Sequence, residues 1–279
     1  MLLDRINIFK SKTDEDLMTF WDHLESLRFS IFRMMALLFV LVAFIFGFKD
    51  FVFNEIVFAP LNSDFIIYRL MCKLAVLLNS PDFCPGDFNI QLINIDISGQ
   101  FIAHLSSTLS IALVLAVPYL LFEIWKFVAP ALYPTEKKSV GLVFLSSSFL
   151  FYMGAVVSYF LVFPLTIRFL GTYQISDKVP NQISIQSYMS TLYILVFAMG
   201  LMFEMPILAY FLSRLGILTR QTMKRIRSYA LIVILILAAV ITPTTDPFTM
   251  LVVALPLYLL YEVSILVSKD RPVEVDEEE

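Results

Sequence analysis

Three acidic residues within or beside long apolar stretches are the side chains of this sequence best suited to chemistry at depth in a membrane. They are Glu204, Asp246 and Glu262. An ionisable group in such a place is costly to bury, so each is a candidate intramembrane polar site or a contact for a partner helix. Glu204 is the deepest, and Pro206 two residues later frees a backbone carbonyl one turn earlier.

Each intramembrane acid also has a simpler alternative role. Glu204 could be a neutral carboxyl, hydrogen-bonded in a helix packing interface. Glu262 could pair with a basic loop residue, and Asp246 could cap the helix that follows it. Glu123 precedes Lys126 by three residues, which favours an ion pair within one helix.

A second group of acids flanks the apolar stretches. Asp22 and Glu25 lie in an amphipathic segment beside Arg28, and Glu136 lies in a connection punctuated by Pro134. Carboxylates at a membrane surface can receive guanidinium groups through two parallel hydrogen bonds, a strong and selective contact. The alternatives are a Glu25 to Arg28 ion pair and a favourable contact of Glu136 with a helix dipole.

Composition places the whole chain in a membrane. Of its 279 residues 59% are apolar and 16% charged, and the mean hydropathy is +0.81, well outside the soluble range. The net charge of −4 argues against nucleic-acid binding. Two Cys and two His are too few for a dedicated metal site, and no nucleotide or hydrolase motif occurs, so we expect no cofactor and no enzyme.

The expected fold is an all-α polytopic membrane protein with six transmembrane helices. A span needs about 20 apolar residues. The spans are expected at about 29–48, 102–125, 140–162, 188–213, 229–241 and 248–267. The last two are separated by a short turn and should form a hairpin. The fifth would cover only about 20 Å, short of a hydrocarbon core of about 30 Å, unless it begins nearer Arg227.

Charge counting orients these spans. Fourteen Lys and Arg residues fall on the face that holds both termini and five on the opposite face, which predicts cytoplasmic termini. The domains are then a cytoplasmic amphipathic segment at 1–28, without the features of a cleavable signal peptide, a membrane domain at 29–267 and an acidic cytoplasmic tail at 268–279.

The long outer loop 49–101 should contain one short interfacial helix, at 65–78. Cys72 and Cys84 both fall in this loop, on the oxidising side of the membrane. They are therefore a possible disulfide pair.

Several strings resemble the TatC family, the multispanning subunit of the twin-arginine protein translocase. The most specific string is Ile124-Trp125-Lys126-Phe127-Val128-Ala129-Pro130-Ala131-Leu132-Tyr133-Pro134-Thr135-Glu136-Lys137-Lys138. Others are His23-Leu24-Glu25-Ser26-Leu27-Arg28, Phe58-Ala59-Pro60-Leu61, Phe203-Glu204-Met205-Pro206 and the Thr242-Pro243 turn with Asp246. Together the matching strings span about residues 19–267 in family order.

The resemblance implies a receptor in the bacterial inner membrane. Such a receptor binds the twin-arginine signal peptides of folded precursors and, with single-span TatA and TatB partners and further copies of itself, exports them using the proton-motive force. It implies signal-peptide contacts at Glu136, Phe127, Ser26 and Arg28. It also implies structural roles for four prolines: Pro60, Pro130, Pro206 and Pro243.

The sequence departs from the family at one of the two acids that receive the arginine pair. Family members carry Glu where this chain has Ser26. Glu25 is adjacent but turned by about 100° around the helix, and Asp22 shares the face of Ser26, so either acid could substitute. A small-solute transporter with Glu204 as its midplane site is the alternative function, and it predicts internal repeats.

Overall fold

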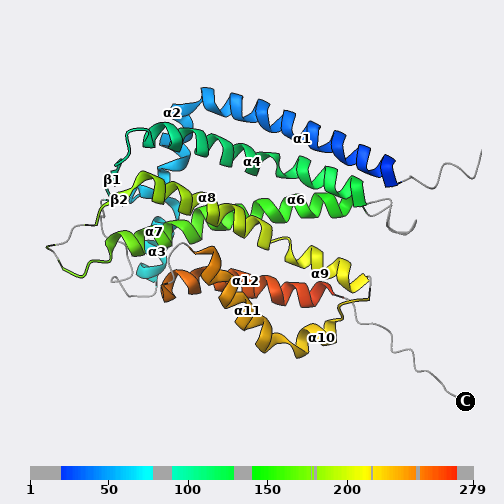
Figure 1. Ribbon diagram of the computed structural model, residues 1–279. Coiled ribbons are helices and arrows are strands. Elements are labelled where there is room, and N and C mark those ends of the chain that lie inside the picture. The colour runs from blue at the N-terminus through cyan, green and yellow to red at the C-terminus, as the bar shows by residue number, and fades with distance from the viewer. Residues whose placement is uncertain are drawn as a thin grey trace, which may run out of the picture.

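Long helices running side by side make up the protein, as the computed structural model shows (Figure 1). The structure describes residues 20–77, 90–128, 140–176, 178, 181–214, 216–242 and 246–268. Within them the first half contains α1 (Phe20–Gly47), α2 (Lys49–Phe51), the π-helix η1 (Val52–Val57), the 3-10 helix η2 (Ala59–Leu61), α3 (Ile66–Leu77), β1 (Leu92–Ile93) and α4 (Gly99–Val128). The second half contains α6 (Val140–Val157), the π-helix η5 (Ser158–Val162), α7 (Phe163–Thr172), β2 (Ile183–Ser184), α8 (Ile185–Met202), α9 (Met205–Arg214), α10 (Arg220–Arg225), α11 (Arg227–Ile241) and α12 (Pro247–Val267).

Five helical segments of the described residues are long and apolar enough to cross a membrane. They are Leu27–Gly47, Gly99–Ile124, Val143–Thr172, Ile185–Arg214 and Pro247–Val267. The segment expected as a fifth span is the shorter helix α11, which has 15 residues. It begins at Arg227, as the alternative placement of its start predicts. At 1.5 Å per residue it is still only about 22 Å long.

The helix expected to end at Val162 continues to Thr172. A proline usually marks a helix boundary at the preceding residue, and Pro164 lies just beyond the expected end. The π-turn of η5 precedes Pro164 and leaves it near the start of α7, where its missing N–H is tolerated. The chain therefore stays helical past the proline.

Among the described residues, one pair of short strands departs from a purely helical fold. β1 and β2 form a two-stranded parallel pair in which Leu92 is opposite Ile183. A helix is found close to the expected range 65–78, as α3, and its interfacial position stays a prediction. Its Tyr68 is buried, with its hydroxyl 2.9 Å from the carbonyl oxygen of Pro164 and 3.3 Å from that of Pro60. Burial raises the pKa of Tyr68 above its ordinary value, so the phenol stays protonated and can donate.

Cys72 of α3 is disulfide-bonded. Cys84 lies outside the described residues, so the pairing of the two cysteines stays a prediction.

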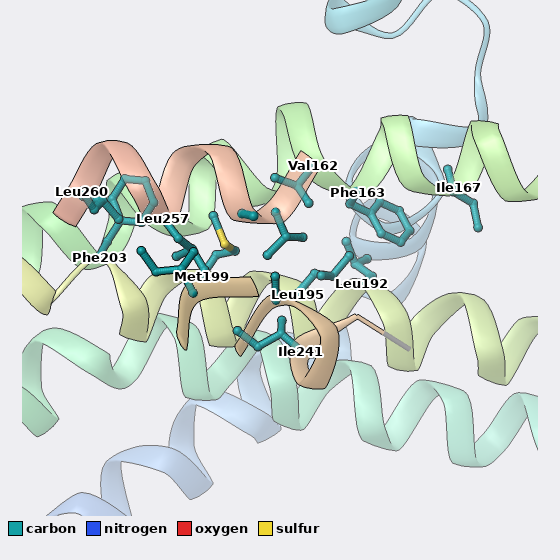
Figure 2. Close-up of a cluster of buried hydrophobic side chains, with 14 of the residues drawn as sticks. Val162, Phe163, Ile167, Leu192, Leu195, Met199, Phe203, Ile241, Leu257 and Leu260 are labelled. Atoms are coloured by element: carbon teal, nitrogen blue, oxygen red, sulfur yellow. The ribbon is translucent and has the colours of Figure 1, made fainter. Parts of the chain in front are cut away.

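The main core lies between the second-half helices (Figure 2). Leu195 and Met199 of α8, Phe163 of α7 and Leu257 of α12 are fully or almost fully buried there. By contrast, only 11% of the residues in the most apolar stretch of the first candidate span, Leu27–Gly47, are buried, against 28 to 50% for the other four. Most apolar side chains of α1 are therefore left uncovered by the rest of the described chain.

Two glycines let α6 and α8 approach closely. A Cβ on Gly154 of α6 would lie 2.7 Å from both the carbonyl oxygen of Met199 and the ring of Phe203, and one on Gly200 of α8 would lie 2.6 Å from the ring of Phe151. Close packing through small residues is how helices associate in lipid, where apolar burial gives little driving force.

Replacing Gly154 by Ala should therefore lower the free energy of unfolding by about 1–3 kcal/mol, because the added methyl group overpacks this contact. The measurement is unfolding in mixed detergent micelles followed by circular dichroism. Gly141 of the same helix is the matched control, since a Cβ there meets nothing within 4 Å. Gly141→Ala should leave stability unchanged or raise it by up to about 1 kcal/mol through helix propensity. Equal effects of the two substitutions would contradict this packing.

Candidate functional site

The N-terminal ends of α1 and α6 and the C-terminal end of α4 lie at one end of the molecule (Figure 1). The first helix begins there at Phe20, α4 ends there at Val128 and α6 begins there at Val140. Helix α4 packs against both α1 and α6. The two helix ends that flank segment 129–139 thus lie beside the segment of α1 that carries Glu25.

Glu25 and Arg28 are both exposed on this part of α1. They form no ion pair with each other, so that alternative is wrong. The guanidinium carbon of Arg28 instead lies 5.6 Å from the centroid of the Phe32 ring. Glu25 is therefore a carboxylate with exposed oxygens at the surface, the state in which it can accept an external guanidinium group.

Several predicted site residues cannot be placed at the level of their side chains. Glu136 and Pro130 lie outside the described residues, as does Pro243. Asp22, Ser26 and Phe127 lie in described helices, but their side chains are not described. Their roles stay predictions.

A polar cluster joins α1 to α4 just inside this surface. Glu123 of α4 is only 4% exposed, and both of its oxygens are used. Oε1 accepts from Arg33 Nε at 3.0 Å and from Tyr119 Oη at 2.9 Å. Oε2 accepts from Arg33 Nη2 at 3.0 Å and from Ser30 Oγ at 2.7 Å. The guanidinium group is held through two parallel hydrogen bonds, the strongest form of this contact.

This cluster corrects the expected role of Glu123. The carboxylate pairs with Arg33 of another helix rather than with Lys126 of its own helix. Sequence reasoning missed Arg33, the one Lys or Arg that neither face of the charge count included, because it lies inside the first apolar stretch. A charged residue within a span is itself the signal that could have identified it, since such residues usually have a buried partner.

Glu204 lies in the break between α8 and α9, at residues 203–204. Its Oε2 accepts a hydrogen bond from Ser147 Oγ of α6 at 2.5 Å. Its Oε1 is buried and has no hydrogen-bond partner among the described residues. Pro206 is buried at the second position of α9, directly after this break. Glu204 is thus a deep carboxyl group with unused hydrogen-bonding capacity.

The other two acids predicted to lie in the membrane have partners that account for them. Asp246 is the N-cap of α12, and its Oδ1 accepts from the backbone N–H of Thr249 at 2.8 Å. Glu262 accepts from Arg227 Nη2 at 2.7 Å and from Tyr258 Oη at 3.2 Å. A helix cap and a salt bridge between α11 and α12 are structural contacts.

Comparison with known proteins identifies the family. A sequence model described as "TatC: Sec-independent protein translocase protein (TatC)" matches residues 22–256. The chain belongs to the TatC family. It is therefore a membrane subunit of the twin-arginine protein translocase, and TatC proteins are translocase components, not enzymes.

Relatives match over most of the chain. The Sec-independent protein translocase protein TatC of Blattabacterium (strain BPLAN) is 32% identical over 259 residues, 92% of this chain and 97% of that protein. The TatC of Deinococcus radiodurans is 39% identical over 191 residues, 68% of this chain and 70% of its own length.

Two crystal structures of the twin arginine translocase receptor TatC have the same fold. One superposes with a TM-score of 0.69 at 29% identity, covering 88% of this chain and 99% of that chain. The other gives 0.64 at 27% identity and covers 88% and 97%. These likenesses extend across the membrane domain and are not confined to the motifs.

Proposed function

We propose that this TatC protein is the receptor that binds twin-arginine signal peptides at its cytoplasmic face. The observation that supports this most is the meeting of the inner ends of α1, α4 and α6, which puts the exposed Glu25 beside the flanks of the segment containing Glu136. Two neighbouring carboxylates match the chemistry of two neighbouring guanidinium groups. Ser26, Arg28 and Phe127 would border the same surface, and Asp22 is the other candidate for the second acid.

The proposed topology has six spans, with α11 as a short fifth span and α11 and α12 as a hairpin. Both termini would be cytoplasmic, in the inner membrane of a bacterium. Five basic residues lie in the connection before α11 and at its start: Arg214, Arg220, Lys224, Arg225 and Arg227. They would lie at the cytoplasmic surface, in agreement with the positive-inside rule. The short α11 would require local thinning of the bilayer.

Partner subunits of the TatA and TatB type would contact the membrane-embedded surface, and export would use the proton-motive force. Among the intramembrane acids Glu204 is the best candidate for a polar partner contact, because Asp246 and Glu262 are occupied by their own partners. Ser147 hydrogen-bonds only one of the two carboxyl oxygens of Glu204. The other oxygen is buried in this structure, so a hydrogen-bonding group on a partner helix would satisfy it once the Glu204 side chain turned toward that helix.

The test is direct binding to the full chain in lipid nanodiscs. A fluorescent twin-arginine signal peptide should bind and be displaced by the unlabelled peptide. An otherwise identical twin-lysine peptide should bind at least about tenfold more weakly, because an ammonium group cannot make the two parallel hydrogen bonds. Equal affinity for the two peptides would remove the proposed receptor site.

A further inference from the structure

Helix α1 packs against α4, but few of its described side chains are fully buried. Among the described side chains from Glu25 to Phe44, Ser30 is the only buried one. Phe29, Phe32 and Phe39 are 54, 60 and 76% exposed. In lipid, burial of apolar side chains gives little hydrophobic driving force for helix association, because hydrocarbon chains are equally apolar. Interhelical hydrogen bonds and ion pairs therefore add to close packing in holding α1 on α4.

The cluster around Glu123 is the polar attachment that the structure provides. Ser30 and Arg33 of α1 donate three hydrogen bonds to the Glu123 carboxylate of α4. The carboxylate is almost fully buried, so water competes little for these bonds. Arg33, with 47% of its side chain exposed, covers the carboxylate from the outside.

The position of this cluster relates it to the receptor surface. Ser30 lies five residues, or about 7.5 Å along the helix, from Glu25. Glu123 lies five residues before Val128, where α4 ends and the segment containing Glu136 follows. The cluster thus fixes α1 and α4 to each other one to two turns below the surface that we assign to the signal peptide. A displacement of α1 at this level would move Glu25 relative to the end of α4.

We propose that the Arg33–Glu123 pair is a positioning device for signal-peptide binding. It holds the inner end of α1 in register with the inner end of α4. Glu25 on α1 and Glu136 in the segment after α4 then stand at the separation required by two adjacent arginines. Bidentate contacts tolerate little misplacement. This inference rests on the proposed function, and it assigns Arg33 and Glu123 no direct contact with the peptide.

The test uses the double variant Arg33→Ala/Glu123→Gln in the full chain. Removing both charges avoids a buried carboxylate without a partner, which would destabilise the fold by itself. The variant should bind the twin-arginine peptide about tenfold more weakly than the wild type, a typical factor for coupling between sites. Arg33→Lys keeps the charge but loses the paired hydrogen bonds, so it should show a smaller loss in the same direction.

A distance measurement separates positioning from a purely structural role. Spin labels at Phe29→Cys and Lys126→Cys, both exposed positions on the inner ends of α1 and α4, should give one narrow distance distribution in the wild type. The distribution should broaden in the double variant and narrow again in part when the peptide is bound. The matched control is Arg69→Ala/Asp64→Asn, which removes an exposed pair of the outer segment and should change neither reading.

The outcomes distinguish this inference from the proposed function. Wild-type protein without preference for the twin-arginine peptide would overturn the proposed function and this inference with it. This inference alone would be overturned if the wild type has that preference but both variants, Arg33→Ala/Glu123→Gln and Arg33→Lys, keep the wild-type affinity or the wild-type distance distribution. Tighter binding by Arg33→Ala would also overturn it, because Glu123 would then be a receptor acid in its own right.

Discussion

Replacing Glu136 by Gln should weaken binding of a twin-arginine signal peptide by about 2–5 kcal/mol, the usual cost of truncating one side of a hydrogen-bonded charge pair. This corresponds to at least about a 30-fold rise in Kd. The amide keeps the size of the carboxyl group but loses its charge and one of its two acceptor oxygens. Because the intact motif around Glu136 is the strongest likeness to TatC receptors, this is the largest effect we expect on binding.

The measurement is peptide binding to protein in nanodiscs, paired with export of a twin-arginine reporter in cells that carry the partner subunits. Glu55→Gln is the matched control, the same isosteric change at an exposed position of the outer segment, and it should alter neither reading. The variants Glu25→Gln and Asp22→Asn are then compared in the same way. The one that weakens binding more identifies the acid that replaces the glutamate found in the family at the position of Ser26. Full binding and export in Glu136→Gln would exclude it as the main receptor acid.

Replacing Arg33 by Ala alone should lower the free energy of unfolding by about 3–5 kcal/mol, the largest stability effect we expect. The substitution leaves the Glu123 carboxylate buried with only Ser30 and Tyr119 as hydrogen-bond donors. Unfolding in mixed detergent micelles measures the loss. Adding Glu123→Gln to this variant should restore most of the stability, because a neutral amide carries no uncompensated charge.

Arg69→Ala serves as the comparison for this effect. Its partner Asp64 is 3.8 Å away, and both side chains are largely exposed, so the loss should stay below about 1 kcal/mol. An Arg33→Ala protein as stable as the wild type, or one that Glu123→Gln destabilises further, would show that the pair contributes little to holding α1.

Much of the fold follows from apolar run lengths and breakers. The five long apolar helical segments, helix α3 and the start of α11 at Arg227 lie close to their predicted positions. Asp246 caps α12, which was one of its two predicted roles. These features depend on residues close together in the chain, so a single sequence is enough to predict them.

Contacts between helices could not be predicted in this way. Glu123 and Arg33 are 90 residues apart, and their pairing depends on how α1 and α4 are rotated and shifted against each other. An i,i+3 rule finds only partners on the same helix, so it pointed to Lys126. The continuation of the helix beyond Val162 was also missed, because the length of an apolar run does not reveal the π-turn that lets the helix continue past Pro164.

Photo-crosslinking tests most directly whether acids at the inner face receive the arginine pair. A photoreactive amino acid at Ser26, and separately at the exposed outer residue Ile66, would be combined with a twin-arginine signal peptide in membranes. We expect a crosslink from Ser26 that an excess of unlabelled twin-arginine peptide removes and a twin-lysine peptide does not, and none from Ile66. Crosslinks of equal strength from both positions, or from Ser26 to both peptides alike, would contradict the receptor site.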